Sequence, residues 1–457
     1  MFSDIKAHVL KEIVPSDIER KEVTSLATRI VEHLTQKISR EKINARVEVV
    51  GSIAKDTWIS KDRDLDIFIV FDKSIPLEDL KKMGLILGKI ELEGFTSETA
   101  YANHPYTINR FKEFKIDVVP CYDSIEIITA VDRTPHHTRF VKENIGELRN
   151  DVRLLKQFMK GVGVYSSEQK IQGFAGYLCE LLIIHYKSFE NVLKSAANWE
   201  YGEYIDIKKK GNKCDFKDPL IVIDPVDPKR NVASALSLDR LSEFIHYSRI
   251  FLESPSVEYF KKKKKLFVKR FPESEVYVIM FEGEMLDDII YPQLRKSAKY
   301  ISTILEKNDF KPLSYGLFKK GEFSGIVFEM EKYLLSPVVK HYGPKVFDRA
   351  NYDSFISKYK ETFIEGDRVY TLRPRNFSNP LGLFLNILNE KEGIGKNMKS
   401  MSFKILKDER ALSFLIGEEA DIYISLLIEY FLTSSTFSIV NAEGIIIAQS
   451  FKLRGTV

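Results

Sequence analysis

The chain has 457 residues, which is too long for a single hydrophobic core and predicts two to four domains. Hydrophobic residues make up 44% and charged residues 29%, which excludes a membrane protein or a disordered chain and indicates a globular one. No apolar run reaches the roughly 18 residues that cross a bilayer. Residues 1–16 also lack an apolar core of signal-peptide length. We therefore expect a cytoplasmic protein with no membrane partner.

Cysteine usage and charge distribution narrow the class further. Cys121, Cys179 and Cys214 are widely spaced, which indicates reduced thiols rather than a disulfide framework, and no Cys/His cluster has zinc spacing. The net charge is only +4, but lysines gather at 208–213 and 261–265 and basic residues recur near the end. Such a run is commonly just a solvated surface, but several runs together favour a polyanionic partner.

Residues 16–40 are predicted to form a helix. Ser16 and Glu19 have capping-box spacing. Apolar residues then recur at the 3.6-residue period of an amphipathic helix. These are Val23, Leu26, Ala27, Ile30, Val31, Leu34 and Ile38.

The stretch from Val49 to Phe71 carries the first chemical signal. It holds a Gly51-Ser52 turn, whose backbone N–H groups can approach a phosphate, and then an apolar strand from Leu65 to Phe71. Side chains alternate along a strand, so Asp64 and Asp66 lie on one face. Two adjacent carboxylates repel unless a cation lies between them, and oxygen ligands indicate Mg²⁺. The alternative is that both aspartates cap a turn and pair with Lys61 or Arg63.

A third carboxylate follows in the next part of the chain. A helix is predicted over 77–87, and His104 lies in a loop-like segment before the next strand. That strand, 114–120, is apolar around Asp117, an unfavourable core residue unless it has a partner. The same metal ions would supply that partner, which gives a small mixed α/β unit with three carboxylates at one sheet edge.

From about residue 140 the pattern becomes helical. Asn150 or Asp151 can cap a helix whose apolar stripe ends near Gly161–Gly163, with Lys156 beside the stripe. The segment 173–189 is apolar nearly all round and predicts a central core helix. Turn-rich residues 224–237 then lead into a helix from about Leu238.

Beyond residue 265 strands return. Apolar runs at 267–271, 276–282, 314–320 and 324–331, with a helix over 291–307, predict an α+β module of RNA-recognition-like type. Further helices are expected around 352–362 and 381–389, and a hairpin near the end turns at 441–444. From periodicity we expect domain borders near 140 and 265, which gives domains at 1–140 (the unit with the three carboxylates), 141–265 (helical, central) and 266–457 (C-terminal α+β domain and tail).

The quoted segments together resemble a known family. The motifs GSIAKDTW, RDLDIF, DVVPCY, TAVDRTPHH, NDVRLLK, GFAGYLCELLI and DPVDPKRNVA are similar to those of the archaeal, class I CCA-adding tRNA nucleotidyltransferases. That family belongs to the polymerase-beta-type superfamily, and the match is dense over 45–240 and looser elsewhere. The resemblance implies a multidomain α+β protein with a polymerase-beta-like palm. It also implies CTP- and ATP-dependent addition of C, C and A to the tRNA 3′ end, with release of pyrophosphate.

The resemblance also implies roles for individual residues. Asp64, Asp66 and Asp117 would hold two Mg²⁺ ions and carry catalysis. The residues that would contact the incoming nucleotide are Ser52, Lys55, His137, Lys156, Tyr165 and Arg230. Arg230 would face the base and, with His104, contact RNA. The C-terminal domains would hold the acceptor stem and T arm of tRNA, and family precedent favours a homodimer.

Alternatives remain open for these residues and for the function. His136 could replace His137, Lys156 could be a solvated lysine, Tyr165 could cover a helix end, and Arg230 could simply pair with Asp224 or Asp227. Another RNA-terminal nucleotidyltransferase, or a 2′–5′ oligoadenylate synthase-like enzyme, would share the three carboxylates. A non-catalytic RNA-binding module is the alternative from a different class.

Overall fold

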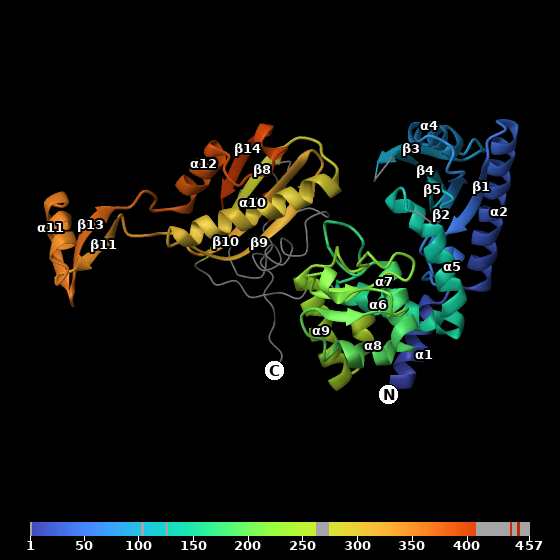
Figure 1. Cartoon of the computed structure of the whole chain (residues 1–457), viewed down its shortest axis with the longest axis horizontal. Helices are drawn as coiled ribbons and strands as arrows, with labels where there is room; N and C mark the ends of the chain where they lie inside the picture. Colours follow the sequence, from blue (N-terminus) through green and yellow to red (C-terminus); the bar gives the residue numbers. More distant parts are fainter. Residues whose placement is uncertain are drawn as a thin grey trace. The chain divides into compact units, whose positions relative to one another are not determined.

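A computed structural model describes residues 2–101, 105–124, 127–261 and 274–407, and the short strands at 439–440 and 446–447. The chain divides into two compact units, Met1–Lys263 and Lys264–Val457 (Figure 1). Among the described residues, no helix combines the length and apolar character needed to cross a bilayer.

A five-stranded mixed sheet organises the first part of unit 1. Its strands are β1 (Ala45–Val50), β2 (Asp64–Phe71), β3 (Thr96–Tyr101), β4 (Pro105–Phe111) and β5 (Phe114–Tyr122). They lie in the order β1-β2-β5-β4-β3, and β2 and β5 run parallel while the other neighbours are antiparallel. The two strands that carry the predicted carboxylates are therefore adjacent.

Helices α2 (Asp17–Arg40), α3 (Gly51–Ala54, a single turn) and α4 (Leu77–Gly88) pack against this sheet. Helix α1 (Phe2–Ile13) instead packs against the helical part of unit 1 through Val9 and Ile13. The predicted capping box is confirmed, because Ser16 and Glu19 bond each other's backbone at the start of α2. The apolar faces of α2 and α4 share one core with alternate residues of β2 and β5, including Ile67 and Val118. The predicted Gly51-Ser52 turn differs in form, since these residues begin α3.

The second part of unit 1 is helical, as predicted. It contains α5 (Arg133–Ile145), α6 (Arg149–Val162), α7 (Gly176–Tyr186), α8 (Phe189–Ala196) and α9 (Leu238–Glu253), with the short strand pair β6 (Glu203–Ile205) and β7 (Leu220–Val222). Helix α6 starts at Arg149 without a side-chain cap and ends at Gly163, which is left-handed. These elements enclose a single large hydrophobic core.

A buried arginine joins the helical part to the sheet part. Arg153 of α6 is 2% exposed and donates from Nε to the Trp58 carbonyl at 2.8 Å. Its Nη2 donates to Oδ1 and to the carbonyl oxygen of Asp56, at 2.5 and 2.7 Å. Arg20 of α2 pairs with the same carboxylate. One aspartate in the loop after α3 thus ties α2 and α6 together.

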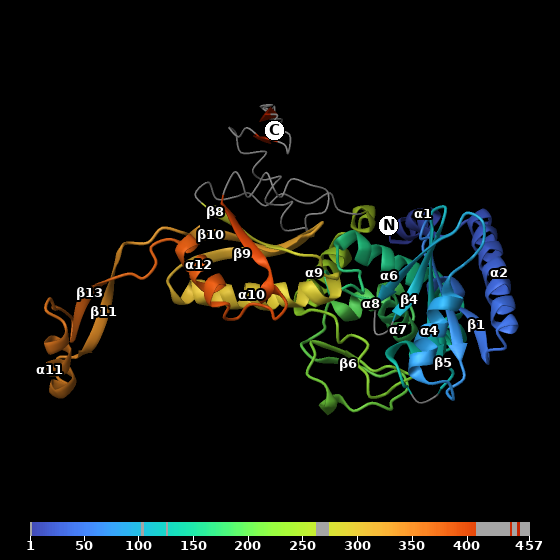
Figure 2. The same ribbon diagram turned by 90° about the horizontal axis from the view of Figure 1, so that it is seen from above.

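Unit 2 is built on a βαββαβ module. It runs through β8 (Glu275–Glu282), α10 (Asp287–Lys307), β9 (Lys311–Lys320), β10 (Phe323–Lys332), α12 (Pro380–Glu390) and β14 (Ser402–Lys407). The strands form an antiparallel sheet in the order β14-β8-β10-β9, and α10 lies along one face of it (Figure 2). Helices α10 and α12 share a core with that face. This α+β module agrees with the predicted fold class, whereas the run 267–271, predicted as a strand, lies outside the described residues.

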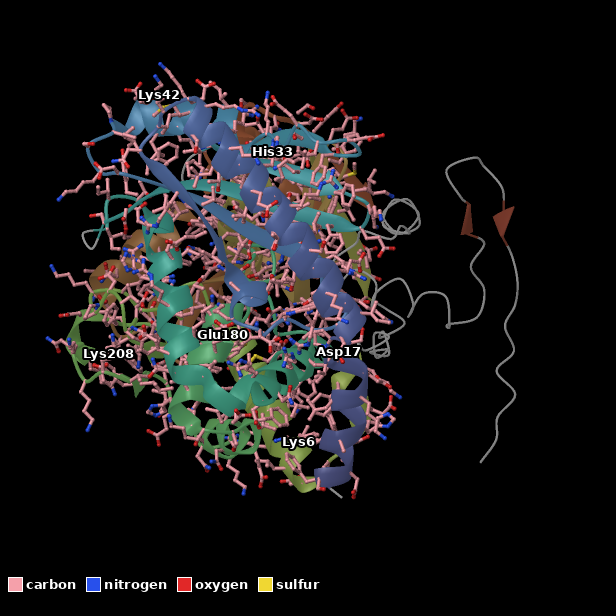
Figure 3. The ribbon with its side chains drawn as sticks, turned by 90° about the vertical axis from the view of Figure 1, so that its right-hand side faces the viewer. Lys6, Asp17, His33, Lys42, Glu180 and Lys208 are labelled. Carbon is pink, nitrogen blue, oxygen red and sulfur yellow. The ribbon has the colours of Figure 1, made fainter. Side chains whose placement is uncertain are left out.

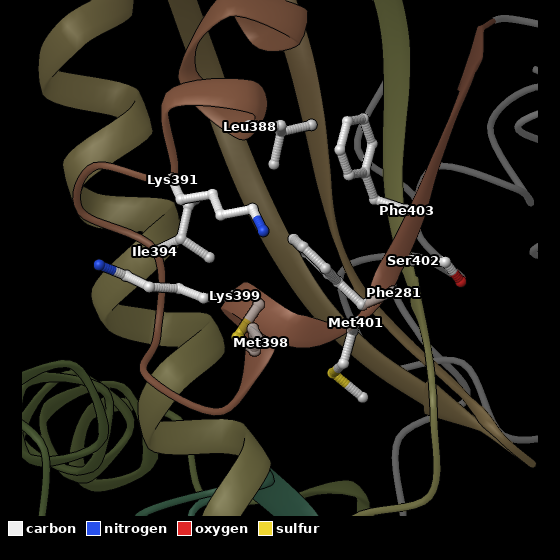
Figure 4. Close-up of a pocket in the computed structure, with 9 residues that line it drawn as sticks. All are labelled: Phe281, Leu388, Lys391, Ile394, Met398, Lys399, Met401, Ser402 and Phe403. Carbon is white, nitrogen blue, oxygen red and sulfur yellow. The ribbon is translucent and has the colours of Figure 1, made fainter.

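An insertion separates β10 from α12. It comprises β11 (Val338–Lys345), α11 (Arg349–Lys358), β12 (Phe363–Glu365) and β13 (Arg368–Pro374), which form a sheet in the order β11-β13-β12. A cavity of about 210 Å³ lies between α12 and β14, with apolar walls that include Phe281 and Phe403 (Figure 4). Near the end, β15 (Ile439–Val440) pairs with β16 (Ile446–Ile447), as expected of a hairpin, although its turn at 441–444 is outside the described residues.

Candidate active site

Two of the predicted catalytic aspartates lie side by side. Strands β2 and β5 are parallel, and their register sets Asp66 directly opposite Asp117. Asp64 is two residues before Asp66 and therefore lies on the same face of β2. The alternative in which Arg63 neutralises these acids is not what the structure shows, because Arg63 pairs with Glu22 at 2.8 Å. The three carboxylates lie on one face of the sheet, on its adjacent interior strands β2 and β5.

The positive charge near this carboxylate group does not offset its burial and mutual repulsion. Burial, reinforced by the neighbouring Asp117, raises the pKa of Asp66 to about 7. Burial also raises the pKa of Asp64. Lys115 donates to Oδ2 of Asp117 at 2.9 Å, but Oδ1 of Asp117 is buried and has no hydrogen-bond partner. A cation beside these carboxylates would reduce their repulsion and provide a partner for the unsatisfied oxygen.

The donor set fits a hard divalent ion that also binds substrate. In the described parts of the chain, no three His, Cys, Asp or Glu side chains are already gathered closely enough to hold an ion. Mg²⁺ typically takes only one or two carboxylates and completes its shell with water and phosphate oxygens. The paired Asp66 and Asp117, with an unsatisfied oxygen between strands, match that incomplete type of site.

Gly51 allows Asp66 to occupy its position. Its φ is +72°, and a Cβ built there would lie 2.0 Å from Oδ2 of Asp66. A side chain at residue 51 would therefore displace the carboxylate as well as strain the backbone. The Gly-Ser motif has a steric role beside Asp66 in addition to the predicted phosphate contact.

Lys55 and Lys156 meet at a buried carboxylate rather than in solvent. Lys55 Nζ lies 2.5 Å from Oε2 of Glu180, and Lys156 Nζ lies 3.5 Å from Oε1. Thr57 completes the cluster, since its hydroxyl donates to Glu180 at 2.5 Å and accepts from Lys156 at 3.3 Å. The solvated-lysine alternative for Lys156 is thereby excluded, because its side chain is 4% exposed. Ser52 is half-buried at the start of the same segment.

His137 and Arg230 meet at a second buried carboxylate, Asp224. His137 Nε2 lies 2.8 Å from Asp224 Oδ2, and Arg230 Nη1 donates to the same oxygen at 2.8 Å. Tyr177 donates to Oδ1 at 3.2 Å and stacks on His137 with ring centroids 4.0 Å apart. Although burial alone would raise it, the pKa of Asp224 is lowered to about 2 by His137, the Val226 amide and Arg230. The Arg230–Asp224 pair that the sequence left open is therefore present.

The remaining candidates are placed as follows. His136 does not join His137, because its Nε2 bonds the Ser124 carbonyl at 3.0 Å. Tyr165 is half-buried, and Lys160 Nζ lies 5.5 Å from the centroid of its ring. His104 lies outside the described residues. Arg230 also lines an open groove of about 870 Å³, together with Asp227 on its own loop and Arg133 of α5.

Sequence reasoning missed Glu180, Asp224 and Tyr177 as members of the site. A signal for Glu180 was available, since one acid in an otherwise apolar core helix must have a buried partner. Asp224 was considered only as a partner of Arg230, and its contacts with His137 and Tyr177 cross between elements far apart in the chain.

Comparisons with known proteins show which family the chain resembles. Three family models match: a nucleotidyltransferase domain over 29–145, the second domain of tRNA nucleotidyltransferase over 150–261, and the C-terminal domain of CCA-adding enzymes over 273–408. A CCA-adding enzyme of Methanothermobacter thermautotrophicus is 37% identical over 401 residues, which cover 84% of this chain and 88% of that protein.

The CCA-adding enzyme of Methanocaldococcus jannaschii is 38% identical, over 85% of this chain and 91% of that protein. Among solved structures, the Cid1 poly(U) polymerase with bound 3′-dATP is similar over 57% of this chain and 99% of its own, at 16% identity and a TM-score of 0.47.

Proposed function

Because the chain belongs to the family of CCA-adding enzymes, we propose that the carboxylates of β2 and β5 form its catalytic centre. The chain is a nucleotidyltransferase that adds C, C and A to the 3′ end of tRNA from CTP and ATP. The observation that carries the assignment of the centre is the register of Asp66 against Asp117, with a buried Asp117 oxygen that has no partner.

Enzymes of this class use divalent metal ions, and we propose Mg²⁺ held by Asp64, Asp66 and Asp117. Bound there, the ions would lower the pKa of the tRNA 3′-hydroxyl and balance the charge of the triphosphate. The protein's own contribution is mainly to position the two substrates, since phosphoryl transfer requires little covalent chemistry from side chains. Gly51 supports this by leaving room for Asp66.

We propose that the nucleotide lies between two buried groups of side chains. One is centred on Glu180, with Lys55 and Lys156, and the other on Asp224, with His137 and Arg230. Ser52, Lys55 and Lys156 would contact the triphosphate, since ammonium and hydroxyl donors suit phosphate oxygens. His137 and Tyr165 would contact the phosphates or the sugar. Arg230 would face the base, where the planar guanidinium discriminates between hydrogen-bonding edges better than an ammonium group.

We propose that three functional regions share the work. Residues 1–140 would carry catalysis, 141–265 would complete the nucleotide site, and 266–457 would hold tRNA by the shape and phosphates of its acceptor stem and T arm. Arg230 and His104 would contact the RNA end. Binding by shape suits an enzyme that serves every tRNA. A homodimer is proposed for the active form.

Replacing Asp66 or Asp117 with alanine tests the proposed centre. Each variant should lose nucleotide incorporation and retain its affinity for tRNA, because the carboxylates bind metal and not the body of the tRNA. Incorporation would be followed on a tRNA transcript by gel, and tRNA affinity by filter binding. Normal turnover in either folded variant would remove these residues from catalysis.

A further inference from the structure

Glu180 is a charged residue in the middle of a core helix. Helix α7 is apolar on every side, and its buried residues include Leu178, Leu181 and Ile184. Glu180 is buried to 0% exposure among them. Figure 3 labels it within the body of unit 1, whereas Lys42 and Lys208 lie at the edge. A carboxylate in such a place is strongly destabilising unless it is paired and hydrogen-bonded.

The partners of Glu180 come from two other elements. Lys55 and Thr57 belong to the loop after α3, which precedes the catalytic strand β2, and Lys156 belongs to α6. Lys156 is also held by the Thr57 carbonyl, at 3.1 Å. Although burial would raise it, the pKa of Glu180 is lowered by Lys55 and then by Lys156. The carboxylate is therefore ionised within the cluster.

The cluster contains two lysines and one carboxylate. Burial lowers the pKa of Lys156, the charge of Glu180 opposes that shift, and the charge of Lys55 adds to it. Two ammonium groups face one carboxylate, and their side chains are only 8% and 4% exposed. Throughout the described residues, no other carboxylate lies within 4.0 Å of either ammonium group. An excess positive charge in a buried place is unfavourable for folding alone, and it attracts an anion.

The cluster lies next to the candidate active site, because Lys55 acts on Asp66 and lies close to Tyr177. The charge of Lys55 lowers the pKa of Asp66, although burial and Asp117 outweigh it. Lys55 Nζ lies 5.9 Å from the centroid of the Tyr177 ring, which stacks on His137. Glu180 itself takes only one of the three N–H donors of Lys55, so the ammonium group can bond another acceptor at the same time.

From these contacts we infer that Glu180 is a positioning residue, which holds Lys55 and Lys156 so that their ammonium groups meet the triphosphate of the incoming CTP or ATP. This inference rests on the proposed nucleotide contacts of the two lysines. Glu180 does not touch the nucleotide. It keeps two like charges close together, and Thr57 fixes the orientation of both the carboxylate and Lys156.

Glu180→Gln tests the inference, since glutamine keeps the size and an accepting oxygen but removes the charge. The affinity for CTP and ATP should fall on the order of tenfold, because the two lysines then repel each other without a counter-ion. The nucleotide KM should rise more than kcat falls, and the Kd for tRNA should stay unchanged. A folded variant with wild-type affinity for both nucleotides would overturn the inference.

A double-mutant cycle separates positioning from simple packing. In the Lys156→Met background only Lys55 remains to be positioned, so Glu180→Gln should lower nucleotide affinity by a clearly smaller factor than in the wild type. An equal factor in both backgrounds would show that Glu180 acts through packing and would contradict the inference.

Asp151→Asn is the matched control. Asp151 is also a buried carboxylate paired with a lysine, Lys6 at 3.0 Å, but it bonds α1 and the start of α8 rather than the cluster. The Asp151→Asn substitution should lower the melting temperature and leave the KM for CTP and ATP unchanged. A comparable rise in KM in this control would attribute the effect of Glu180→Gln to general destabilisation.

Thr57→Val provides a second test if Glu180→Gln does not fold. It removes the hydroxyl's bonds to Glu180 and Lys156 while leaving every charge in place, and it should weaken CTP binding by a smaller factor. Unchanged CTP affinity in this variant would overturn the inference. The proposed function fails separately, if wild-type protein binds CTP yet adds no C or A to tRNA.

Discussion

At the scale of single residues, the position of the Asp66 carboxylate depends on the close approach of Gly51. Gly51→Ala should reduce incorporation by at least about 100-fold, since the new Cβ would displace a carboxylate that must be placed within a fraction of an ångström. Steady-state rates with CTP on tRNA give the measurement.

Gly321→Ala is the control for the backbone effect alone. Gly321 also has a positive φ, +58°, but a Cβ there meets nothing within 4 Å. It should lose roughly 1 kcal/mol of stability and no activity. Equal activity losses in the two variants would contradict the steric role of Gly51.

The raised pKa of Asp66 predicts a pH dependence. The pKa of Asp66 is about 7 in the folded protein, above its ordinary value of 3.8. In metal-free protein the stability that Asp66 contributes is therefore fully present below pH 3.8 and is lost as the pH rises through 7. Metal binding competes with this proton. The increase in melting temperature on adding Mg²⁺ should therefore be larger at pH 8 than at pH 6.

Asp66→Asn provides the comparison for that titration. The variant should lose both the pH-dependent part of the Mg²⁺ effect and the corresponding stability change in metal-free protein. An Mg²⁺ effect of the same size at pH 6 and pH 8 in the wild type would show that Asp66 does not bind the ion in competition with a proton.

At the scale of elements, Arg153 joins the sheet part of unit 1 to its helical part. Arg153→Met should reduce the free energy of unfolding by about 3 kcal/mol, because it leaves the Trp58 carbonyl and Asp56 without their buried donor. Arg149→Met removes only a partly exposed contact of 3.9 Å to the same aspartate and should change it by less than about 1 kcal/mol. Urea denaturation measures both free energies of unfolding. Equal effects of the two substitutions would contradict the role of Arg153 in joining the two parts of unit 1.

Local signals at this scale predicted the elements well, and long-range contacts explain what was missed. The capping box fixed the start of α2, and the apolar strands around Asp66 and Asp117 were found because their pattern is local. Helix α5, which carries His137, escaped prediction because its sequence is mostly polar and Asp132 provides no side-chain cap. The contact of Glu180 with Lys55 joins residues 125 positions apart and that of Asp224 with His137 joins residues 87 apart, separations that no local pattern encodes.

At the scale of the whole molecule, the two units have different architectures. Unit 1 contains the carboxylates and both buried clusters, and unit 2 contains a βαββαβ module whose antiparallel sheet is of the type predicted for RNA binding. The family match to a CCA-adding enzyme C-terminal domain covers 273–408. The sequence predicted that this module is α+β. It did not predict the order of its strands, because the pairing of strands is set by tertiary contacts.

The most direct test of the account is nucleotide incorporation onto a tRNA transcript that ends at the discriminator base, with Mg²⁺ present. We expect two C additions with CTP alone and a single further A only when ATP is also supplied, after which addition stops. Unlimited A addition would identify a poly(A) polymerase. Failure to add any nucleotide while tRNA remains bound would contradict the catalytic assignment of Asp64, Asp66 and Asp117.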